Sequence, residues 1–378
     1  MYKNLAAALA AACFSIPLVA QTPASTPSTP STANTSAAVT EPLKVGFVYV
    51  APLTEAGWVR QHENARLALE KNLGARVKTT YVENVAEGAD AERVIRDLAQ
   101  QGHQLIFTPS FGYMEPTLKV AREFPGVKFE SITGYKTAAN VAVANARYYE
   151  GRYLAGIAAG RMSQSGVAGY VAGFPIPEVL QGINAFALGM RSVQPQAEVK
   201  VIWLNAWFDP PRERDAAMTL FNQNADVLAF HTGSTAVMRA AQERGKLAVA
   251  YHSDMRQTAP DAQLLAVTHH WADYYTQRAR AVLQGVWKSG QLWGGIQEGM
   301  VRVGDFGPKV PQAVQKEVLA RQQDLAAGRL KPFAAGAQPV RDNTGRVVIA
   351  ARSALSDAQI LGMNYLVQGV QGSLPGSQ

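Results

Sequence analysis

The strongest constraint in this sequence is a regular alternation of short β-branched apolar runs with amphipathic segments of helical length. The run KVGFVYV at residues 44–50 is followed by residues 57–73, in which apolar side chains recur every three or four positions. Strands that alternate with helices are typical of parallel sheets, because each crossover must return over a face of the sheet. The sequence therefore predicts an α/β fold.

Two successive series of such units follow each other along the chain. The first contains expected strands at residues 77–82, 104–108 and 127–131 and expected helices at 90–101 and 115–124. The second begins with a helix at 147–162 and continues with strands at 166–171, 199–204, 227–230 and 247–251 and helices at 177–193, 211–222 and 234–244. Two series on a chain too long for one core predict two doubly wound parallel-sheet lobes.

The chain is expected to cross from the second lobe back to the first in its C-terminal part. Residues 263–268 and the helix at 271–288 are expected to cross back to the first lobe. We therefore expect lobe 1 to comprise residues 43–146 and about 267–295, and lobe 2 to comprise 147–266 and about 296–378. Beyond Gly290 the chain is rich in Gly and Pro, and the pattern leaves its assignment to a lobe open.

Residues 1–20 have the pattern of a secretory signal peptide, since Lys3 precedes an uncharged apolar stretch that ends at Ala20. The stretch contains Pro17 and is shorter than the roughly 20 residues that a bilayer crossing needs. Cleavage after Ala20 is expected, and it would remove Cys13, the sole cysteine, and with it any disulfide or thiol chemistry. Processing as a lipoprotein through Cys13 remains the alternative.

Residues 21–42 form a tract of Thr, Ser, Pro and Ala without apolar periodicity. Such a tract buries too little surface to offset the entropy of ordering it, so we expect a disordered tether. An export signal followed by a tether predicts a protein of the periplasm.

The charge pattern bears on the kind of partner. The chain carries 36 Lys and Arg against 29 Asp and Glu, but the basic residues are scattered and form no stripe. Nucleic-acid surfaces normally combine a basic stripe with a recognisable motif. We therefore expect no nucleic-acid partner.

Large aromatic residues occupy several expected strand-to-helix turns, where ligands bind in open α/β sheets. They follow the first and third strands of the first series and one strand of the second: Trp58, Phe111, Tyr113, Trp207 and Phe208. Each ring taken singly can equally serve lobe packing. Because exposed turns normally avoid such rings, their coincidence predicts a cleft for a flat, apolar ligand.

Polar side chains on the same turns are candidates for reading the edge of such a ligand, for example a base. These candidates are Glu55, Asn205, Asp209, His231 and Asp254. Asp209 precedes two prolines and an expected helix, so a capping role is the alternative for it.

Catalytic and cofactor motifs are not found in the sequence. It has no GxSxG, HExxH or phosphate loop, and no GxGxxG after a strand. His269 and His270 are adjacent at a strand end and would point to opposite faces, so no metal site is expected. We expect a protein that is not an enzyme and has no cofactor. An exported nucleoside-hydrolysing enzyme is an alternative, but it would need clustered carboxylates, whereas the turns carry single acids.

Several long segments resemble the basic membrane protein family of ABC-importer binding proteins, which includes purine-nucleoside receptors. They are KVGFVYVAPLTEAGWVRQHENAR, TPSFGYMEPTLKVAREFPGVKFE, YYEGRYLAGIAAGRMSQSGVAGYVAGFPIPEVLQGINAFALGM and WLNAWFDPPRERDAA. The tail segment KPFAAGAQPVRDNTG is also similar, so the resemblance runs from residue 44 to about residue 372.

This resemblance implies a periplasmic binding protein fold of type I, with two lobes joined by a three-strand hinge and a purine held between them. It also implies an ABC permease in the inner membrane as partner, and we expect the binding protein to be a monomer. A ligand sensor for a membrane receptor would use the same clamp and is an alternative.

The first turn of this chain departs from the nucleoside receptors that it resembles. These often carry an Asp and a Ser-Phe-Asn where this chain has TEAGWVR at residues 54–60, and Trp58 matches the stacking Phe. The departure favours an adenine-like free base over a nucleoside. The expected mode is stacking on Trp58 and Phe111 or on Trp207 and Phe208, with the polar edge read by Asn205, Asp209 and Asp254.

Overall fold

The first of the two large sheets consists of six parallel strands, as a computed structural model of residues 41–375 shows. Its order is β11-β5-β4-β3-β1-β2, and the register places Val45 opposite Thr79 and Leu105. The strands are β1 (Leu43–Val48), β2 (Val77–Val82), β3 (Leu105–Pro109), β4 (Lys128–Ile132), β5 (Val141–Ala146) and β11 (Gln291–Gly294). The signal peptide, Cys13 and nearly all of the tether that the sequence predicts lie outside the described residues.

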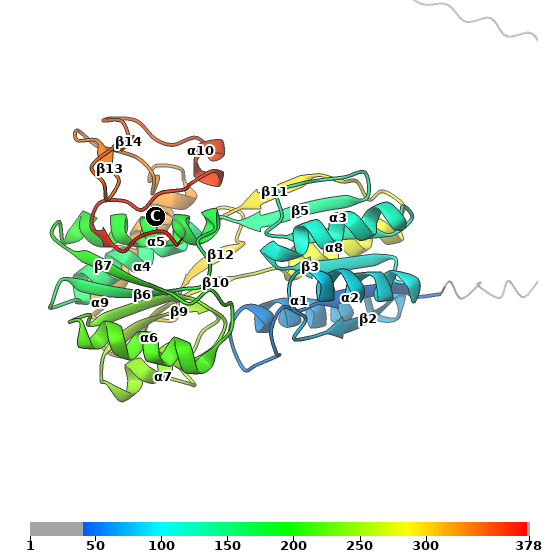
Figure 1. Cartoon of the computed structure of the whole chain (residues 1–378), viewed down its shortest axis with the longest axis horizontal. Coiled ribbons are helices and arrows are strands. Elements are labelled where there is room, and N and C mark those ends of the chain that lie inside the picture. Colours follow the sequence, from blue (N-terminus) through cyan, green and yellow to red (C-terminus); the bar gives the residue numbers. More distant parts are fainter. Residues whose placement is uncertain (1–40, 376–378) are drawn as a thin grey trace, which may run out of the picture. The chain divides into compact units, whose positions relative to one another are not determined.

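Helices cover both faces of this first sheet, as parallel connections require. They are α1 (Trp58–Leu73), α2 (Ala89–Gln100), α3 (Met114–Glu123) and α8 (Ala272–Leu283). Helix α1 packs against α8, and α2 packs against α3 (Figure 1). Because the central strands are buried on both faces, side chains at successive positions such as Ile106 and Phe107 are both fully buried.

The second sheet has seven strands in the order β12-β10-β9-β8-β6-β7-β15. All neighbours are parallel except β12, which runs antiparallel to β10. The strands are β6 (Val167–Ala172), β7 (Glu198–Trp203), β8 (Val227–His231), β9 (Leu247–His252), β10 (Gln263–His269), β12 (Val301–Gly304) and β15 (Val370–Gln371).

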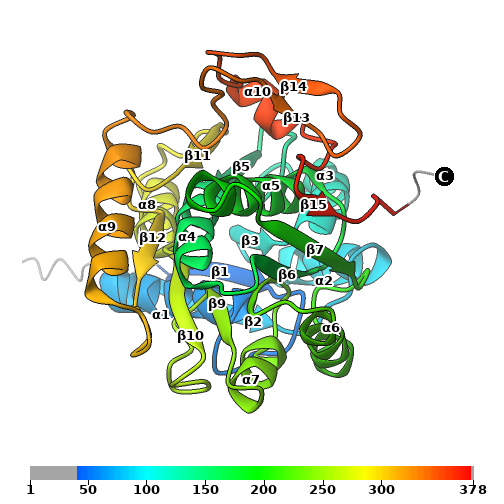
Figure 2. The ribbon, with the colours of Figure 1, turned by 90° about the vertical axis from the view of Figure 1, so that its left-hand side faces the viewer.

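Two helix pairs flank the second sheet. Helix α4 (Tyr148–Met162) packs against α5 (Pro177–Val193), and α6 (Pro210–Asn222) packs against α7 (Ala236–Glu243). Helix α9 (Gln312–Ala326) lies against α4 on its other side (Figure 2). Helix α4 is therefore enclosed by protein, which explains why its sequence is apolar nearly all round.

The chain passes between the two sheets three times. The passages follow β5, β10 and β11 (Figure 1). Because β10 pairs with β9 through residues 266–268, it belongs to the second sheet, and the second passage follows His269 instead of starting at about residue 267. The two α/β lobes predicted from the sequence are both present.

The last part of the chain, which the sequence pattern left open, lies on the second lobe. It contains the short pair β13 (Val340–Arg341) and β14 (Val347–Ile349), helix α10 (Asp357–Leu361) and β15 at the sheet edge (Figure 2). Asn184 of α5 anchors this segment, because its side-chain amide donates to the carbonyl of Tyr365 and accepts from the amide of Val367. No helix among residues 41–375 is long and apolar enough to span a membrane.

Candidate functional site

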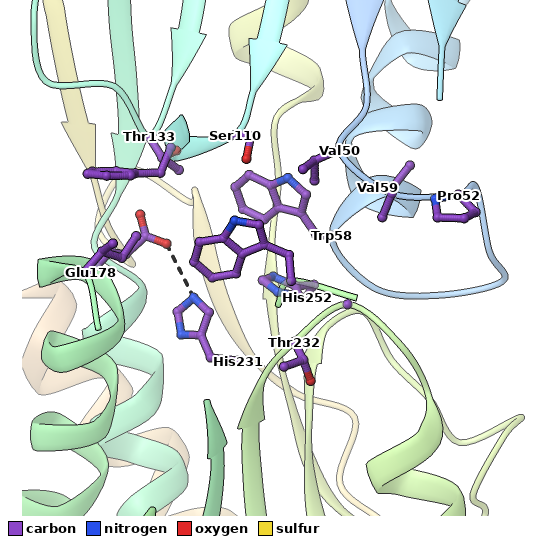
Figure 3. Close-up of a pocket in the computed structure, with 15 residues that line it drawn as sticks. Val50, Pro52, Trp58, Val59, Ser110, Thr133, Glu178, His231, Thr232 and His252 are labelled. Atoms are coloured by element: carbon purple, nitrogen blue, oxygen red, sulfur yellow. Dashed lines mark ion pairs between the residues drawn. The ribbon is translucent and has the colours of Figure 1, made fainter. Parts of the chain in front are cut away.

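A cavity lies where the carboxyl ends of strands from both sheets meet, as expected for open α/β sheets. It contains about 570 Å³ of empty space, a figure that includes space open to solvent. The first lobe lines it with Val50, Ala51, Pro52, Trp58, Val59, Ser110, Phe111 and Thr133 (Figure 3). The second lobe adds Ile176, Glu178, Trp207, His231, Thr232, Gly233 and His252.

Two tryptophans, one from each lobe, line the cavity, and Figure 3 labels the one from the first lobe, Trp58. Trp58 is the first residue of α1, and its indole N–H donates to the carbonyl oxygen of Pro109 at 2.8 Å. Trp207 follows β7, and its indole N–H donates to Glu87 at 3.1 Å. Because both N–H groups already have protein acceptors, the rings are held in place and contribute mainly apolar surface to the cavity.

A third ring, Phe111, completes the aromatic wall. It stacks on Tyr135 with ring centroids 5.6 Å apart and an angle of 28° between the planes. Phe111 lies in the turn after β3, so its position follows directly from the strand-to-helix rule.

Glu178 brings a carboxylate to the cavity wall from the first turn of α5 (Figure 3). Its Oε1 lies 3.5 Å from Nε2 of His231, and its Oε2 is buried without a hydrogen-bond partner. A buried carboxylate oxygen normally has a donor nearby. Glu178 is therefore the acceptor that a ligand with an N–H group would satisfy.

Two cavity residues have the left-handed backbone conformation that residues other than glycine rarely adopt. Thr133 has φ 66° and His252 has φ 69°, and each directly follows or ends a strand. Such strain persists where the surrounding structure enforces it, and it concentrates at functional sites. The conformation places these two side chains at the cavity.

Burial also controls the protonation of the two histidines in the wall. It lowers the pKa of His231 and lowers the pKa of His252 well below the ordinary value. Both imidazoles are therefore neutral at physiological pH, and each has one N–H donor and one acceptor nitrogen.

Direct hydrogen bonds join the lobes around the cavity. The side-chain amide of Gln61 donates to the carbonyl of His252 at 2.6 Å, and the amide of Gly57 donates to Ser253 at 3.0 Å. Gly57 has φ 96°, and a Cβ there would lie 2.4 Å from the carbonyl oxygen of Gly233. Only glycine permits this approach of the two lobes.

Four of the site residues expected from the sequence line the cavity: Trp58, Phe111, Trp207 and His231. Two expected aromatics do not. Tyr113 is fully buried below the turn and donates to the carbonyl of Val85 at 2.6 Å. Phe208 packs beside Gly233, outside the cavity lining. The sequence placed both rings on the correct turns but did not determine the direction of their side chains.

The polar candidates other than His231 lie outside the cavity, in contrast to the expectation. Asp209 is the N-cap of α6 and accepts from the amide of Arg212 at 3.1 Å. Asn205 is exposed in a left-handed turn with φ 52°. Glu55 is exposed and pairs with Arg239 at 3.0 Å.

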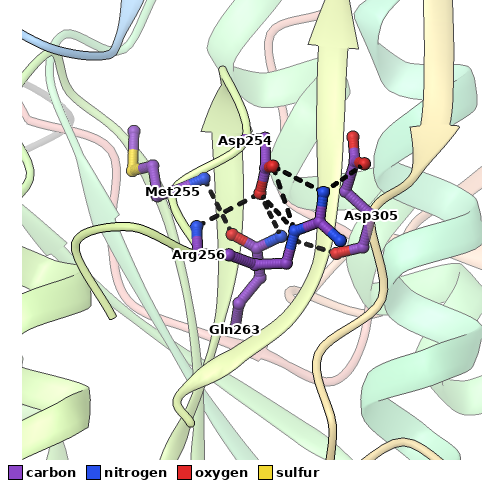
Figure 4. Close-up of polar contacts among 5 residues, drawn as sticks. All are labelled: Asp254, Met255, Arg256, Gln263 and Asp305. Atoms are coloured by element: carbon purple, nitrogen blue, oxygen red, sulfur yellow. Dashed lines mark hydrogen bonds and ion pairs between the residues drawn. The ribbon is translucent and has the colours of Figure 1, made fainter. Parts of the chain in front are cut away.

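Asp254 belongs to a surface network instead of the cavity (Figure 4). Arg256 pairs with Asp254 and with Asp305 at 2.7 Å each, and the amide of Gln263 donates to Asp254 at 2.8 Å. Partial burial raises the pKa of Asp254, but the hydrogen bonds from Arg256 and Gln263 together outweigh it and hold the pKa below its ordinary value. Its carboxylate is therefore occupied by cationic and amide donors of the protein.

Polar cavity residues that the sequence did not suggest as candidates are Ser110, Thr133, Glu178 and His252. Glu178 lies in the first turn of the helix that follows β6, and the other candidates were chosen because they too follow a strand in this way. His252 ends β9 and could have been found in the same way. Among residues 41–375, no group of three His, Cys, Asp or Glu side chains is arranged to hold a metal ion.

The comparisons with known proteins agree with this architecture. A family model described as ABC transporter substrate-binding protein, PnrA-like, matches residues 43–331. The chain belongs to this family. A purine-binding protein of Brucella abortus is 49% identical over 335 residues, covering 89% of this chain and 95% of the relative. A putative ABC transporter glucose-binding protein of Haloferax volcanii is 35% identical, covering 89% of this chain and 82% of the relative.

Solved structures show the same fold. An ABC solute-binding protein from Aeropyrum pernix K1 has a TM-score of 0.66 at 19% identity, covering 78% of this chain and 93% of the other. A comK transcriptional activator from Bacillus halodurans has a TM-score of 0.62 at 24% identity, covering 76% of this chain and 99% of the other. The type I periplasmic-binding fold with two lobes expected from the sequence is confirmed.

Membership in this family defines the general role of the chain. It is the solute-binding component of an ABC system, so its partners are a small-molecule ligand and a permease. The family consists of extracytoplasmic binding proteins, not of enzymes.

Proposed function

We propose that this protein binds a purine base, with adenine as the preferred type, in the periplasm and delivers it as a monomer to an ABC permease. The observation that carries the proposal is that Trp58 and Trp207, from different lobes, line one cavity with their indole N–H groups already bonded to protein. Flat apolar walls suit a heteroaromatic ring, because base-on-aromatic stacking contributes about 1–3 kcal/mol per base.

The polar lining supports the same ligand class. Glu178 has a buried acceptor oxygen without a partner, and a purine base supplies N–H donors at its edge. The purine-binding relative from Brucella, at 49% identity over nearly its full length, supports the assignment from an independent direction. Closure of the lobes buries the ligand and forms a joint surface for the permease, without any bond being made or broken.

A sugar is the second candidate, since the relative from Haloferax is described as a putative glucose-binding protein. Calorimetric titration with adenine, hypoxanthine, guanine, adenosine, inosine, ribose and glucose separates the two. We expect the free bases to bind, with adenine tightest. Binding of glucose or ribose alone would overturn the purine proposal. Release of free base from a nucleoside would instead indicate a hydrolase, and normal purine uptake after gene deletion would favour a sensor.

The role of Trp207 is tested with a matched tryptophan from the same lobe. Trp207→Ala should weaken adenine binding at least tenfold, because it removes one stacking face. Trp203→Ala is the control, because Trp203 is half-buried on β7 and donates to the carbonyl of Ser373 outside the cavity. Equal affinities of the two variants would contradict the stacking role.

A further inference from the structure

Three aromatic side chains form a directed hydrogen-bond chain that ends at the cavity wall. The indole nitrogen of Trp271 lies 2.8 Å from Nδ1 of His269, and Nε2 of His269 lies 2.6 Å from Nδ1 of His252. All three side chains are almost completely buried. His252 also lines the cavity, whereas Trp271 and His269 are not among the lining residues.

The chemistry of the indole fixes the direction of every bond in this chain. Because Trp271 can only donate, Nδ1 of His269 must be the unprotonated, accepting nitrogen. A neutral His269 then carries its proton on Nε2 and donates to Nδ1 of His252. By the same reasoning, a neutral His252 carries its proton on Nε2.

Both imidazoles are held in the neutral form by their surroundings. Burial is the largest cause that lowers the pKa of His252 and of His269 well below the ordinary value. The groups that face His252 from other elements are His269 on β10, His231 on β8, Arg152 on α4 and His62 on α1, and each of them disfavours a positive charge there.

The remaining polar atom of His252 has no protein partner. Its Nδ1 is used by His269, and no side chain or backbone group of residues 41–375 makes a hydrogen bond with its Nε2. The residue is held in a strained left-handed backbone conformation at the end of β9, while its carbonyl accepts from Gln61 of the other lobe. A strained residue with a free donor at a ligand cavity points to a contact with the ligand.

We propose that Trp271 and His269 are positioning residues that hold His252 as the Nε2–H tautomer, so that His252 donates a hydrogen bond to a ring nitrogen of the bound heterocycle. This inference rests on the proposed function, which places a nitrogen heterocycle in the cavity. Together with the acceptor oxygen of Glu178, it defines the ligand class as a neutral ring system with an unprotonated nitrogen and a separate N–H group.

The tautomer is tested without any ligand. Two-dimensional ¹H–¹⁵N spectra of the protein labelled in histidine distinguish protonated from unprotonated ring nitrogens. We expect His252 and His269 both to be protonated at Nε2 only. In Trp271→Phe the donor to His269 is lost, and the nitrogen signals of both histidines should change, whereas Trp203→Phe should leave them unchanged. A proton on Nδ1 of His252 in the unmodified protein would overturn the inference.

The ligand contact is tested with adenine and its 1-, 3- and 7-deaza analogues, each of which replaces one ring nitrogen by C–H. We expect one analogue to bind the unmodified protein about tenfold or more weakly than adenine, because the donor is left unsatisfied. This difference should disappear in His252→Phe and shrink in Trp271→Phe. The series in the unmodified protein remains decisive where a variant does not fold.

The outcomes separate this inference from the proposed function. If adenine binds but all analogues bind equally well, the contact with His252 is wrong and the purine proposal stands. If no purine binds the unmodified protein, the purine proposal fails, and the proposed contact fails with it. The spectra still report whether the tautomer itself is fixed.

Discussion

Glu178 supplies an acceptor at the cavity wall, and its charge should matter for affinity. Glu178→Gln should weaken adenine binding about 10- to 100-fold, because hydrogen bonds to charged groups contribute about 1.5–3 kcal/mol. Calorimetry on this variant provides the measurement. Glu115→Gln is the control, because Glu115 is exposed and pairs with Lys136 away from the cavity. An unchanged affinity of Glu178→Gln would show that the ligand does not use this carboxylate.

His62 makes the stability of the fold sensitive to acid. Its Nδ1 lies 2.6 Å from the hydroxyl of Tyr275, and burial lowers its pKa to about 3. The unfolded chain, with a histidine pKa of about 6.5, therefore binds protons more readily. The stability contributed by neutral His62 is complete above about pH 6.5 and is lost as the pH falls toward 3.

The variant His62→Asn tests this linkage, because it keeps a polar group but does not titrate. Between pH 6 and 4, the free energy of unfolding should fall less steeply in His62→Asn, by up to about 1.4 kcal/mol per pH unit. Urea unfolding at several pH values measures the slope. Tyr275→Phe keeps the histidine and should keep the slope of the unmodified protein. Identical slopes for His62→Asn and the unmodified protein would refute the linkage.

At the scale of elements, the contact between α4 and α5 depends on glycine. A Cβ at Gly156 would lie 2.1 Å from the carbonyl oxygen of Phe186, and one at Gly189 would lie 2.0 Å from that of Tyr153. Alanine is preferred over glycine in a helix interior by about 1 kcal/mol, so replacing glycine by alanine at an ordinary helix position would raise the free energy of unfolding. Here the backbones must separate, and overpacking costs about 1–3 kcal/mol.

Gly189→Ala should therefore lower the free energy of unfolding by about 1–3 kcal/mol, as measured by urea denaturation. Because α5 also carries Glu178, ligand affinity should fall in the same variant. Gly126→Ala is the control, since no atom lies within 4 Å of a Cβ there. A gain in stability for Gly189→Ala would show that the helices separate at no cost.

The sequence predicted the elements far better than the polar side chains of the site. Strands such as β1 and β8 are buried on both faces and leave continuous apolar runs, which are visible locally. Trp58 and Trp207, which line the cavity, could be named as candidates because large rings are unusual on turns. Asn205 and Glu55 lie on the expected turns but outside the cavity lining. The side-chain direction of Asn205 depends on its left-handed backbone, and that of Glu55 depends on Arg239, 184 residues away in the sequence. Strand β15 joins β7 from the far end of the chain, so no local pattern reveals it.

At the scale of the whole molecule, Glu87 links closure of the lobes to the ligand site. This half-buried carboxylate of the first lobe accepts from Ser110 at 2.6 Å, from the amide of Gly112 at 2.9 Å and from Trp207 of the second lobe at 3.1 Å. The bond to Trp207 therefore exists only while the lobes are together. This bond stabilises the closed arrangement of the lobes and fixes the indole of Trp207, on which the ligand is proposed to stack.

Glu87→Ala should speed dissociation of adenine about 10- to 100-fold, because a charge-assisted bond contributes about 1.5–3 kcal/mol and affinity changes appear mostly in the dissociation rate. Stopped-flow displacement measures the rate, and small-angle scattering with saturating adenine should show a more open average. Glu55→Ala is the matched control, because Glu55 also pairs with a residue of the second lobe, Arg239. In this pair the side chain of Glu55 is 56% exposed and that of Arg239 is 60% exposed. Exposed pairs contribute little, so Glu55→Ala should change the rate only a few-fold. If Glu55→Ala sped dissociation as much as Glu87→Ala, closure would depend on general attraction between the lobes and not on the bond to Trp207.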